Sequence, residues 1–163
     1  MARIIKNTQG DVLVVIPDER NPPGYDTFLD HDLTDAVFDG LILEGARFDD
    51  CNLTRANFRG TDLYWASFMM SNAECADFEG ADLRGANFTD GSFRNCNFKN
   101  ANLGRDNVGG YASFVRADLR GADFRNTILD GIEFAGAKHD SSTLFPANFS
   151  ATTRGLVKID IKG

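Results

Sequence analysis

The sequence predicts an all-β solenoid, a chain wound into a stack of short extended segments, and two observations carry this prediction. Phe or Leu recurs at every fifth position over about two thirds of the 163 residues, and a small residue stands two positions before most of them. A period of five fits neither an α-helix, which repeats every 3.6 residues, nor a strand, which repeats every two. It fits a chain that turns a corner every five residues.

The repeat divides residues 26–137 into 22 five-residue units, and 12 of the 14 Phe occupy the repeated position, here called the central position. The register slips by one residue at Gly109-Gly110-Tyr111 and then resumes. The central residues are Phe28, Leu33, Phe38, Leu43, Phe48, Leu53, Phe58, Leu63, Phe68, Ala73, Phe78, Leu83, Phe88, Phe93, Phe98, Leu103, Val108, Phe114, Leu119, Phe124, Leu129 and Phe134.

The central residue and the residue two before it must point to the same side, as alternate residues of a strand do. Both are apolar or small, so we expect both to point inward and the other three residues of a unit to point outward. By this rule Cys51 and Cys96 lie inside and Cys75 lies outside. A single unit cannot bury its inward pair, so the units must stack into a solenoid.

Units such as ANFRG, ADFEG and ADLRG resemble the pentapeptide-repeat family, and the resemblance extends over residues 26–137. It implies a right-handed quadrilateral β-helix with four units per coil, and therefore about five and a half coils. The chain, residues 1–163, is then a single domain. Residues 1–25 form an N-terminal β-hairpin cap and residues 138–163 an irregular C-terminal cap.

Both ends of the stack need a cover, because the bare edge of a sheet pairs readily with another chain. RIIKN and VLVVI predict a β-hairpin whose apolar run Val12 to Ile16 covers the first coil, and PDERNPPG then ends the strand. At the other end we expect Phe145, Pro146 and Phe149 to cover the last coil and LVKIDIKG to form a strand. Either cap could also support a homodimer.

The sequence shows no pattern typical of catalysis or of cofactor binding. His31 and His139 are the only histidines, and neither has a Cys or carboxylate at metal-ligand spacing. Glycines such as Gly80 and Gly85 recur at the corners of the repeat, which indicates turns and not a dinucleotide-binding loop. The sequence therefore predicts a protein that is not an enzyme and that has no catalytic, metal or cofactor site.

Composition argues against some classes of binding partner and indicates where the protein is located. The net charge of −7 argues against direct binding to nucleic acid or to an anionic membrane. No apolar segment approaches the roughly 20 residues that span a bilayer, and MARIIKNTQG lacks the pattern of a signal peptide. Three Cys, an odd number at no ligand spacing, indicate a reduced, cytoplasmic protein.

The charge is distributed unevenly along the repeats. Residues 26–50 contain eight acids and one base, residues 51–83 have a net charge of −3, and residues 84–126 have a net charge of +3. The predicted rod is acidic at its start and mildly basic later. We expect the acidic surface to include Asp35, Asp39, Glu44, Asp49 and Asp50.

The favoured function is a rigid protein-protein interaction module or scaffold that binds through its outer faces. The alternative comes from the resemblance, because resistance-type members of the family bind type II topoisomerases such as gyrase by imitating duplex DNA. Two features count against that alternative. The later coils have the wrong charge, and the one-residue slip leaves no room for the projecting loops that those members commonly have.

The outward positions of LYWASFMMSN predict a partner-binding patch made of Tyr64, Trp65, Met69 and Met70. With four units per coil, Trp65 lies between glycines 45 and 85 of the neighbouring coils. The two Met residues lie among Asp49, Asp50, Thr89 and Asp90. An apolar centre with an acidic rim is typical of a protein contact site, where Trp and Tyr are enriched.

Overall fold

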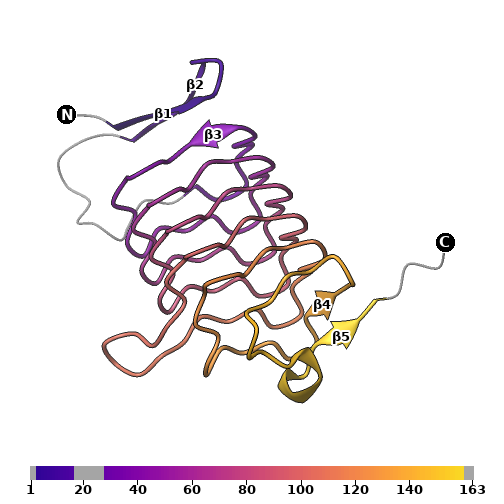
Figure 1. The fold of residues 1–163 in the computed structure, drawn as a ribbon. Coiled ribbons are helices and arrows are strands. Elements are labelled where there is room, and N and C mark those ends of the chain that lie inside the picture. The colour runs from indigo at the N-terminus through magenta and orange to yellow at the C-terminus, as the bar shows by residue number, and fades with distance from the viewer. Residues whose placement is uncertain (1–2, 17–27, 160–163) are drawn as a thin grey trace.

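The computed structural model of the chain describes residues 3–16 and 28–159. It is a stack of coils with a hairpin over the N-terminal end and an irregular segment over the C-terminal end (Figure 1). No α-helix occurs in the described ranges, and no helix within them could span a bilayer. The elements are β1 (Arg3–Asn7), β2 (Val12–Ile16), β3 (Ala36–Val37), β4 (Lys138–His139), the 3-10 helix η1 (Ala151–Arg154) and β5 (Val157–Lys158).

Each coil contains four five-residue units, because the backbone bridges join residues that are 20 apart, as between Asp32 and Asn52 or Asn57 and Asp77. At each corner the chain makes a turn, such as the one in which the Ala36 N–H donates to the Leu33 carbonyl at 3.0 Å. The third residue of these turns has positive φ, which is the signature of a type II turn and suits Gly, Asn and Asp. The result is the right-handed quadrilateral β-helix that the sequence predicted.

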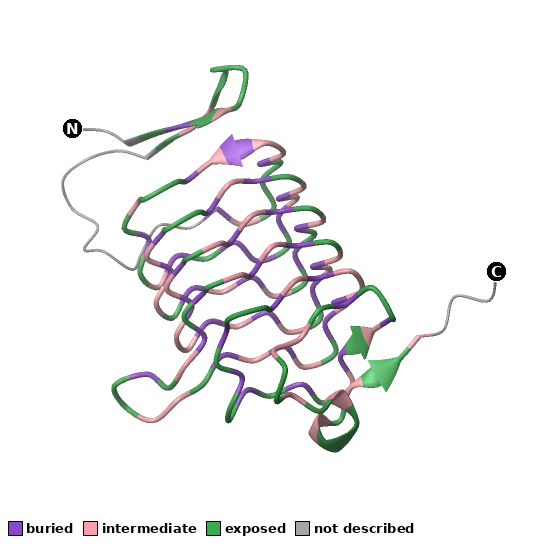
Figure 2. Cartoon of the chain, in the orientation of Figure 1, coloured by how far each residue is buried: buried purple, intermediate pink, exposed green. Residues whose placement is uncertain are grey.

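The core is a double column of phenylalanine rings. The 12 central Phe are at most 1% exposed, and buried and outward residues alternate along every coil (Figure 2). Within a column the ring centroids lie 4.4 to 5.6 Å apart and the planes are within 2° to 9° of parallel, while rings of opposite columns meet edge to face. The columns are Phe28, Phe48, Phe68, Phe88, Phe114 and Phe134, and Phe38, Phe58, Phe78, Phe98 and Phe124.

Phe93 lies outside both columns, on a side of the coil where the central residues are mostly Leu. Two small residues make room for its ring. Ala73 occupies the central position one coil earlier, and a Cβ at Gly91 would lie 2.5 Å from the Phe93 ring. The departures from the repeat at Ala73 and Gly91 are therefore packing solutions for one large side chain.

The predicted N-terminal hairpin is present, and both of its strands contribute to the cover: β1 pairs with β3 of the first coil, and Leu13 and Val14 of β2 pack against the core. The sheet order is β2-β1-β3, with Lys6 and Asn7 of β1 paired to Val37 and Ala36. Ile5 is buried, whereas Val12 is 54% exposed. The expected break PDERNPPG lies outside the described residues.

At the other end, two aromatic rings continue the core. Phe145 stacks on Phe124 with the centroids 5.8 Å apart, and Phe149 meets the Phe134 ring at 5.5 Å. This confirms that these two residues cover the last coil. Beyond η1, β5 pairs in parallel with β4; the end of LVKIDIKG lies outside the described residues.

The inward assignment of Val108 was wrong, since this residue is 76% exposed. Asn87 pairs with Ser113, 26 residues later, and the spacing returns to 20 between Ser113 and Glu133. The coil from Asn87 to Ser113 is therefore six residues longer than the others, whereas the sequence indicated a slip of one residue. The extra residues belong to a loop, residues 104–111, that projects from the stack (Figure 1).

Candidate functional site

The 104–111 loop is fastened to the rod at the corner that carries Tyr64 and Trp65. The Trp65 indole N–H donates to Asp106 Oδ2 at 2.7 Å, and the Asn107 N–H donates to the Tyr64 hydroxyl at 3.3 Å. The two rings stack with centroids 5.4 Å apart, and the Arg84 guanidinium lies 5.2 Å from the Tyr64 centroid. The aromatic pair therefore serves first as a platform for the loop of its own chain.

Asp106 is the residue through which the loop is held. Its Oδ1 accepts the N–H groups of Val108 at 2.9 Å and of Gly110 at 2.6 Å, while Oδ2 accepts the indole N–H. The side chain is buried. The indole of Trp65, followed by the loop's own backbone N–H groups, holds the pKa of Asp106 below its usual range, because each of these donors favours the carboxylate.

A glycine on the neighbouring coil leaves the space that the Trp65 indole occupies. Gly85 has a φ of +70°, and a Cβ there would lie 2.1 Å from Trp65 Cδ1. The expected position of Trp65 beside Gly85 is therefore what the structure shows. Trp65 itself has a φ of 57° and stays 49% exposed, so part of the indole faces outward.

The attachment of the loop should depend on pH in the acid range. The Asp106 pKa is lowered from about 3.8, so the hydrogen bonds are favoured above the unfolded-state pKa and are lost as pH falls through the lower folded-state pKa. Because Trp65 is the only Trp, its emission should change as the pH falls below about 4. Asp106→Asn should lack that transition. An identical transition in this variant would contradict the assignment.

Met69 and Met70 lie at the next corner of the same coil, beside the acids that the sequence placed there. They line a pocket of about 190 Å³ together with Leu29, Asp30, Arg47, Asp49 and Asp50. The Asp50 N–H donates to the Met69 carbonyl at 2.9 Å, and the Met70 N–H donates to that of Thr89 at 3.0 Å. The four residues of the predicted patch therefore occupy two corners, of which one holds the loop and the other lines a pocket.

The acidic surface is smaller than the sequence indicated. Asp49 is buried, because Arg47, Ser67 and the Met69 N–H all donate to its carboxylate. Asp35 forms a two-point ion pair with Arg55, at 2.7 Å for each contact. Five exposed acids have no side-chain partner among the described residues. Glu133 is one of them, and the other four lie in residues 28–50: Asp30, Asp39, Glu44 and Asp50.

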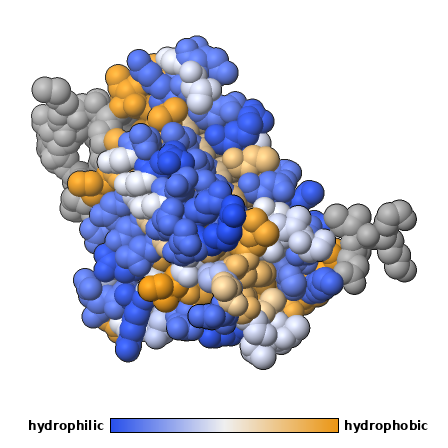
Figure 3. Space-filling model, viewed as in Figure 1, coloured by the Kyte–Doolittle hydropathy of each residue, from blue (hydrophilic) through white to orange (hydrophobic). Residues whose placement is uncertain are grey.

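Acids farther along the rod are mostly neutralised within the chain. Asp77 and Glu79 pair with Arg59, and Asp90 pairs with Arg116. Arg125, followed by other donors that include Lys99, lowers the pKa of Asp123 to about 2. The face drawn in Figure 3 is mostly hydrophilic, with separate hydrophobic spots. Negative charge without an intramolecular counterion is therefore concentrated toward the N-terminal coils.

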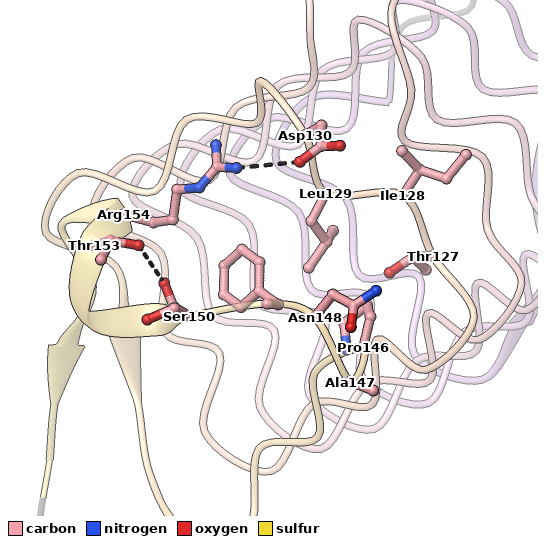
Figure 4. A pocket seen from close by; sticks show the side chains of 11 residues that line it. Thr127, Ile128, Leu129, Asp130, Pro146, Ala147, Asn148, Ser150, Thr153 and Arg154 are labelled. Carbon is pink, nitrogen blue, oxygen red and sulfur yellow. Dashed lines mark hydrogen bonds and ion pairs between the residues drawn. The ribbon is translucent and has the colours of Figure 1, made fainter.

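A larger pocket, of about 320 Å³, lies under the C-terminal cap (Figure 4). Its walls come from residues 127–130, the turn 146–150, and Thr153 and Arg154 of η1. Arg154 donates to Asp130 at 3.2 Å across the rim, and the Asp130 side chain is 91% exposed. An ion pair this exposed contributes little, roughly 0–1 kcal/mol, so this contact only steadies the cap.

The described residues contain no group of three or more His, Cys, Asp and Glu side chains that could hold a metal ion. Cys51 and Cys96 are buried and Cys75 is exposed, as predicted. Burial raises the pKa of Cys51 to about 11 and also raises that of Cys96, so both thiols stay protonated and unreactive at neutral pH.

A comparison with known protein families matches the repeat region of the chain. The profile of the family "pentapeptide repeats" matches residues 32–68, 71–105 and 111–138 in eight copies, which is more than half of the chain. The chain belongs to the pentapeptide repeat family. The match leaves out residues 106–110, which lie in the projecting loop. A search of curated protein sequences found no significant match.

Solved structures of pentapeptide repeat proteins resemble this one. A protein from the Arabidopsis thaliana thylakoid lumen is 30% identical with a TM-score of 0.56, and the match covers 61% of this chain and 65% of that one, just under two thirds of its length. HetL, involved in heterocyst differentiation regulation in Nostoc, is 22% identical with a TM-score of 0.44, over 70% and 59% of the two chains. QnrB1, a plasmid-mediated fluoroquinolone resistance protein, is 22% identical with a TM-score of 0.39, over 76% and 67%. The last two scores are too low to support a functional argument.

Proposed function

We propose that this pentapeptide repeat protein is a non-enzymatic, rigid interaction module that binds another protein through the outer surface of its first coils. One observation carries the proposal. Four exposed carboxylates without a side-chain partner in the described residues gather at this end of the rod, while farther along Glu133 alone is exposed without one and most of the other acids are paired. A partner with a basic surface would be attracted here without displacing an internal ion pair. We place this function in the cytoplasm, as the cysteine content predicts.

The rod suits this role because its surface is held in place before a partner arrives. The stacked core and the ladder of backbone hydrogen bonds leave little freedom to the outward positions, so binding costs little ordering of the module. Opposite charges mainly raise the association rate and give salt dependence.

The test is capture of partners from a lysate of the source organism on three immobilised proteins. The wild type and Glu133→Lys, a charge reversal at an exposed acid in the C-terminal half, should retain the same partner. The double variant Asp39→Lys/Asp50→Lys should lose it by about tenfold or more at low salt. If all three proteins retain the same set, the acidic coils are not the binding surface.

Binding to a type II topoisomerase is the second candidate, and the projecting loop favours it. The sequence indicated that no loop projects from the coils, which counted against this candidate. The structure has a projecting loop, residues 104–111, so this argument no longer applies. Deleting residues 106–111, the six-residue excess, restores the spacing of 20. Arg105 then becomes the third residue of a corner turn, a position with positive φ that Arg55 and Arg116 occupy in other coils.

Micromolar wild-type protein should alter gyrase supercoiling, and the deletion variant should alter it less. An unchanged reaction with the wild type would contradict this candidate.

A further inference from the structure

The pocket at the Met69 and Met70 corner has the size of a side chain. Its volume of about 190 Å³ lies below the roughly 300–1,000 Å³ of sites that enclose small-molecule ligands. Its apolar wall consists of Leu29, Met69 and Met70, and Met70 is 54% exposed. Unbranched Met side chains adapt their shape to what they contact.

The base of the pocket is already satisfied by internal contacts. Arg47 donates through Nε at 3.1 Å and Nη2 at 2.8 Å to one carboxylate oxygen of Asp49. The other oxygen accepts the Met69 N–H at 3.1 Å and the Ser67 hydroxyl. The two opposite charges cancel, so Asp49 fixes the backbone of Met69 and does not supply charge to an incoming group.

The rim is different, because it carries two acids that nothing in the described residues neutralises. Asp30 and Asp50 occupy the same corner position on successive coils, with φ values of 60° and 59°. Strands of successive coils lie about 4.8 Å apart, and like charges on neighbouring strands repel each other. With Arg47 and Asp49 cancelling, the pocket has a net charge of −2 from these two exposed residues.

We propose, on the basis of the proposed function, that this pocket receives one arginine side chain of the partner protein. The aliphatic stem of an arginine would lie along Leu29 and the Met residues, as long cationic side chains do on apolar surfaces. Its planar guanidinium has several donors in a fixed fork and can bridge the carboxylates of Asp30 and Asp50. A lysine offers a single compact charge and fits this pair of acids less well.

Methyl NMR tests this directly, because the chain has only three methionines and two of them line the pocket. The full-length protein with ¹³C-methyl Met is titrated with acetyl-Gly-Arg-Gly-amide and with the matched Lys and Gln peptides. The arginine peptide should shift the Met69 and Met70 signals saturably in the millimolar range and leave Met1 unmoved. Met70→Leu identifies its signal by removing it.

Carboxylate variants complete the test. Asp50→Asn should weaken arginine-peptide binding about two- to fivefold, as expected for an exposed ion pair, whereas Glu133→Gln should not. Equal shifts with the Gln peptide, equal affinity for the Lys peptide, or equal weakening by both variants would overturn the proposal.

The two proposals fail separately. If the arginine peptide moves neither Met69 nor Met70 while Asp39→Lys/Asp50→Lys still loses the captured partner, the arginine pocket is wrong and the interaction module stands. If the peptide binds as expected but no captured protein depends on the acidic coils, the proposed function is wrong.

Discussion

Replacing Phe58 with Ala is expected to lower the free energy of unfolding by about 3–5 kcal/mol. The ring is fully buried and stacks on both sides, with centroids 4.6 Å from Phe38 and 4.9 Å from Phe78. It also meets Phe48 and Phe68 edge to face. Truncation would interrupt a column in the middle and leave a cavity that the surrounding coils, tied by backbone ladders, cannot close. Urea denaturation followed by circular dichroism measures the loss.

Val108→Ala is the matched control, because the period of five assigns Val108 to the same central position. Its side chain is 76% exposed, so its loss should change stability by no more than about 0.5 kcal/mol. If the two substitutions had similar costs, either the ring column would not carry the stability or the loop would be packed more closely than the structure shows.

Gly85→Ala is expected to cost about 2–5 kcal/mol and to release the loop. A left-handed backbone with a Cβ costs about 1–2 kcal/mol, and forcing atoms into an occupied space adds about 1–3 kcal/mol. Here the new Cβ would lie 2.1 Å from Trp65, so the indole must move and its hydrogen bond to Asp106 must break. Acrylamide should then quench Trp65 more readily.

Gly80→Ala separates the two effects. Gly80 has the same φ of +70°, but a Cβ there would have nothing within 4 Å. Its substitution should show only the backbone cost of about 1–2 kcal/mol and leave the quenching of Trp65 unchanged. Equal costs for the two glycines would mean that the contact of Trp65 with Gly85 contributes nothing.

Much of the candidate site could be predicted from the sequence, and some of it could not. The outward direction of Trp65 and Met70, and the acids beside the Met residues, follow from the place of each residue within its unit and from the coil of 20. The burial of Asp49 was missed, although its position is an outward one. Arg47, Ser67 and Met69 surround its carboxylate, and that depends on side-chain rotamers that a period does not describe.

The sequence by itself determined the β-helix, its inward residues and the aromatic cover of its last coil. The reason is physical: one five-residue pattern recurs so often that each side chain has only one side on which it can be buried. Only the tertiary structure decided where the pattern stops describing the chain. Val108 follows the period, yet the ladder joins Asn87 to Ser113 across a loop, and Trp65 binds Asp106 from 41 residues away. Whether a unit stays in the coil depends on these distant partners, and a local repeat contains no information about them.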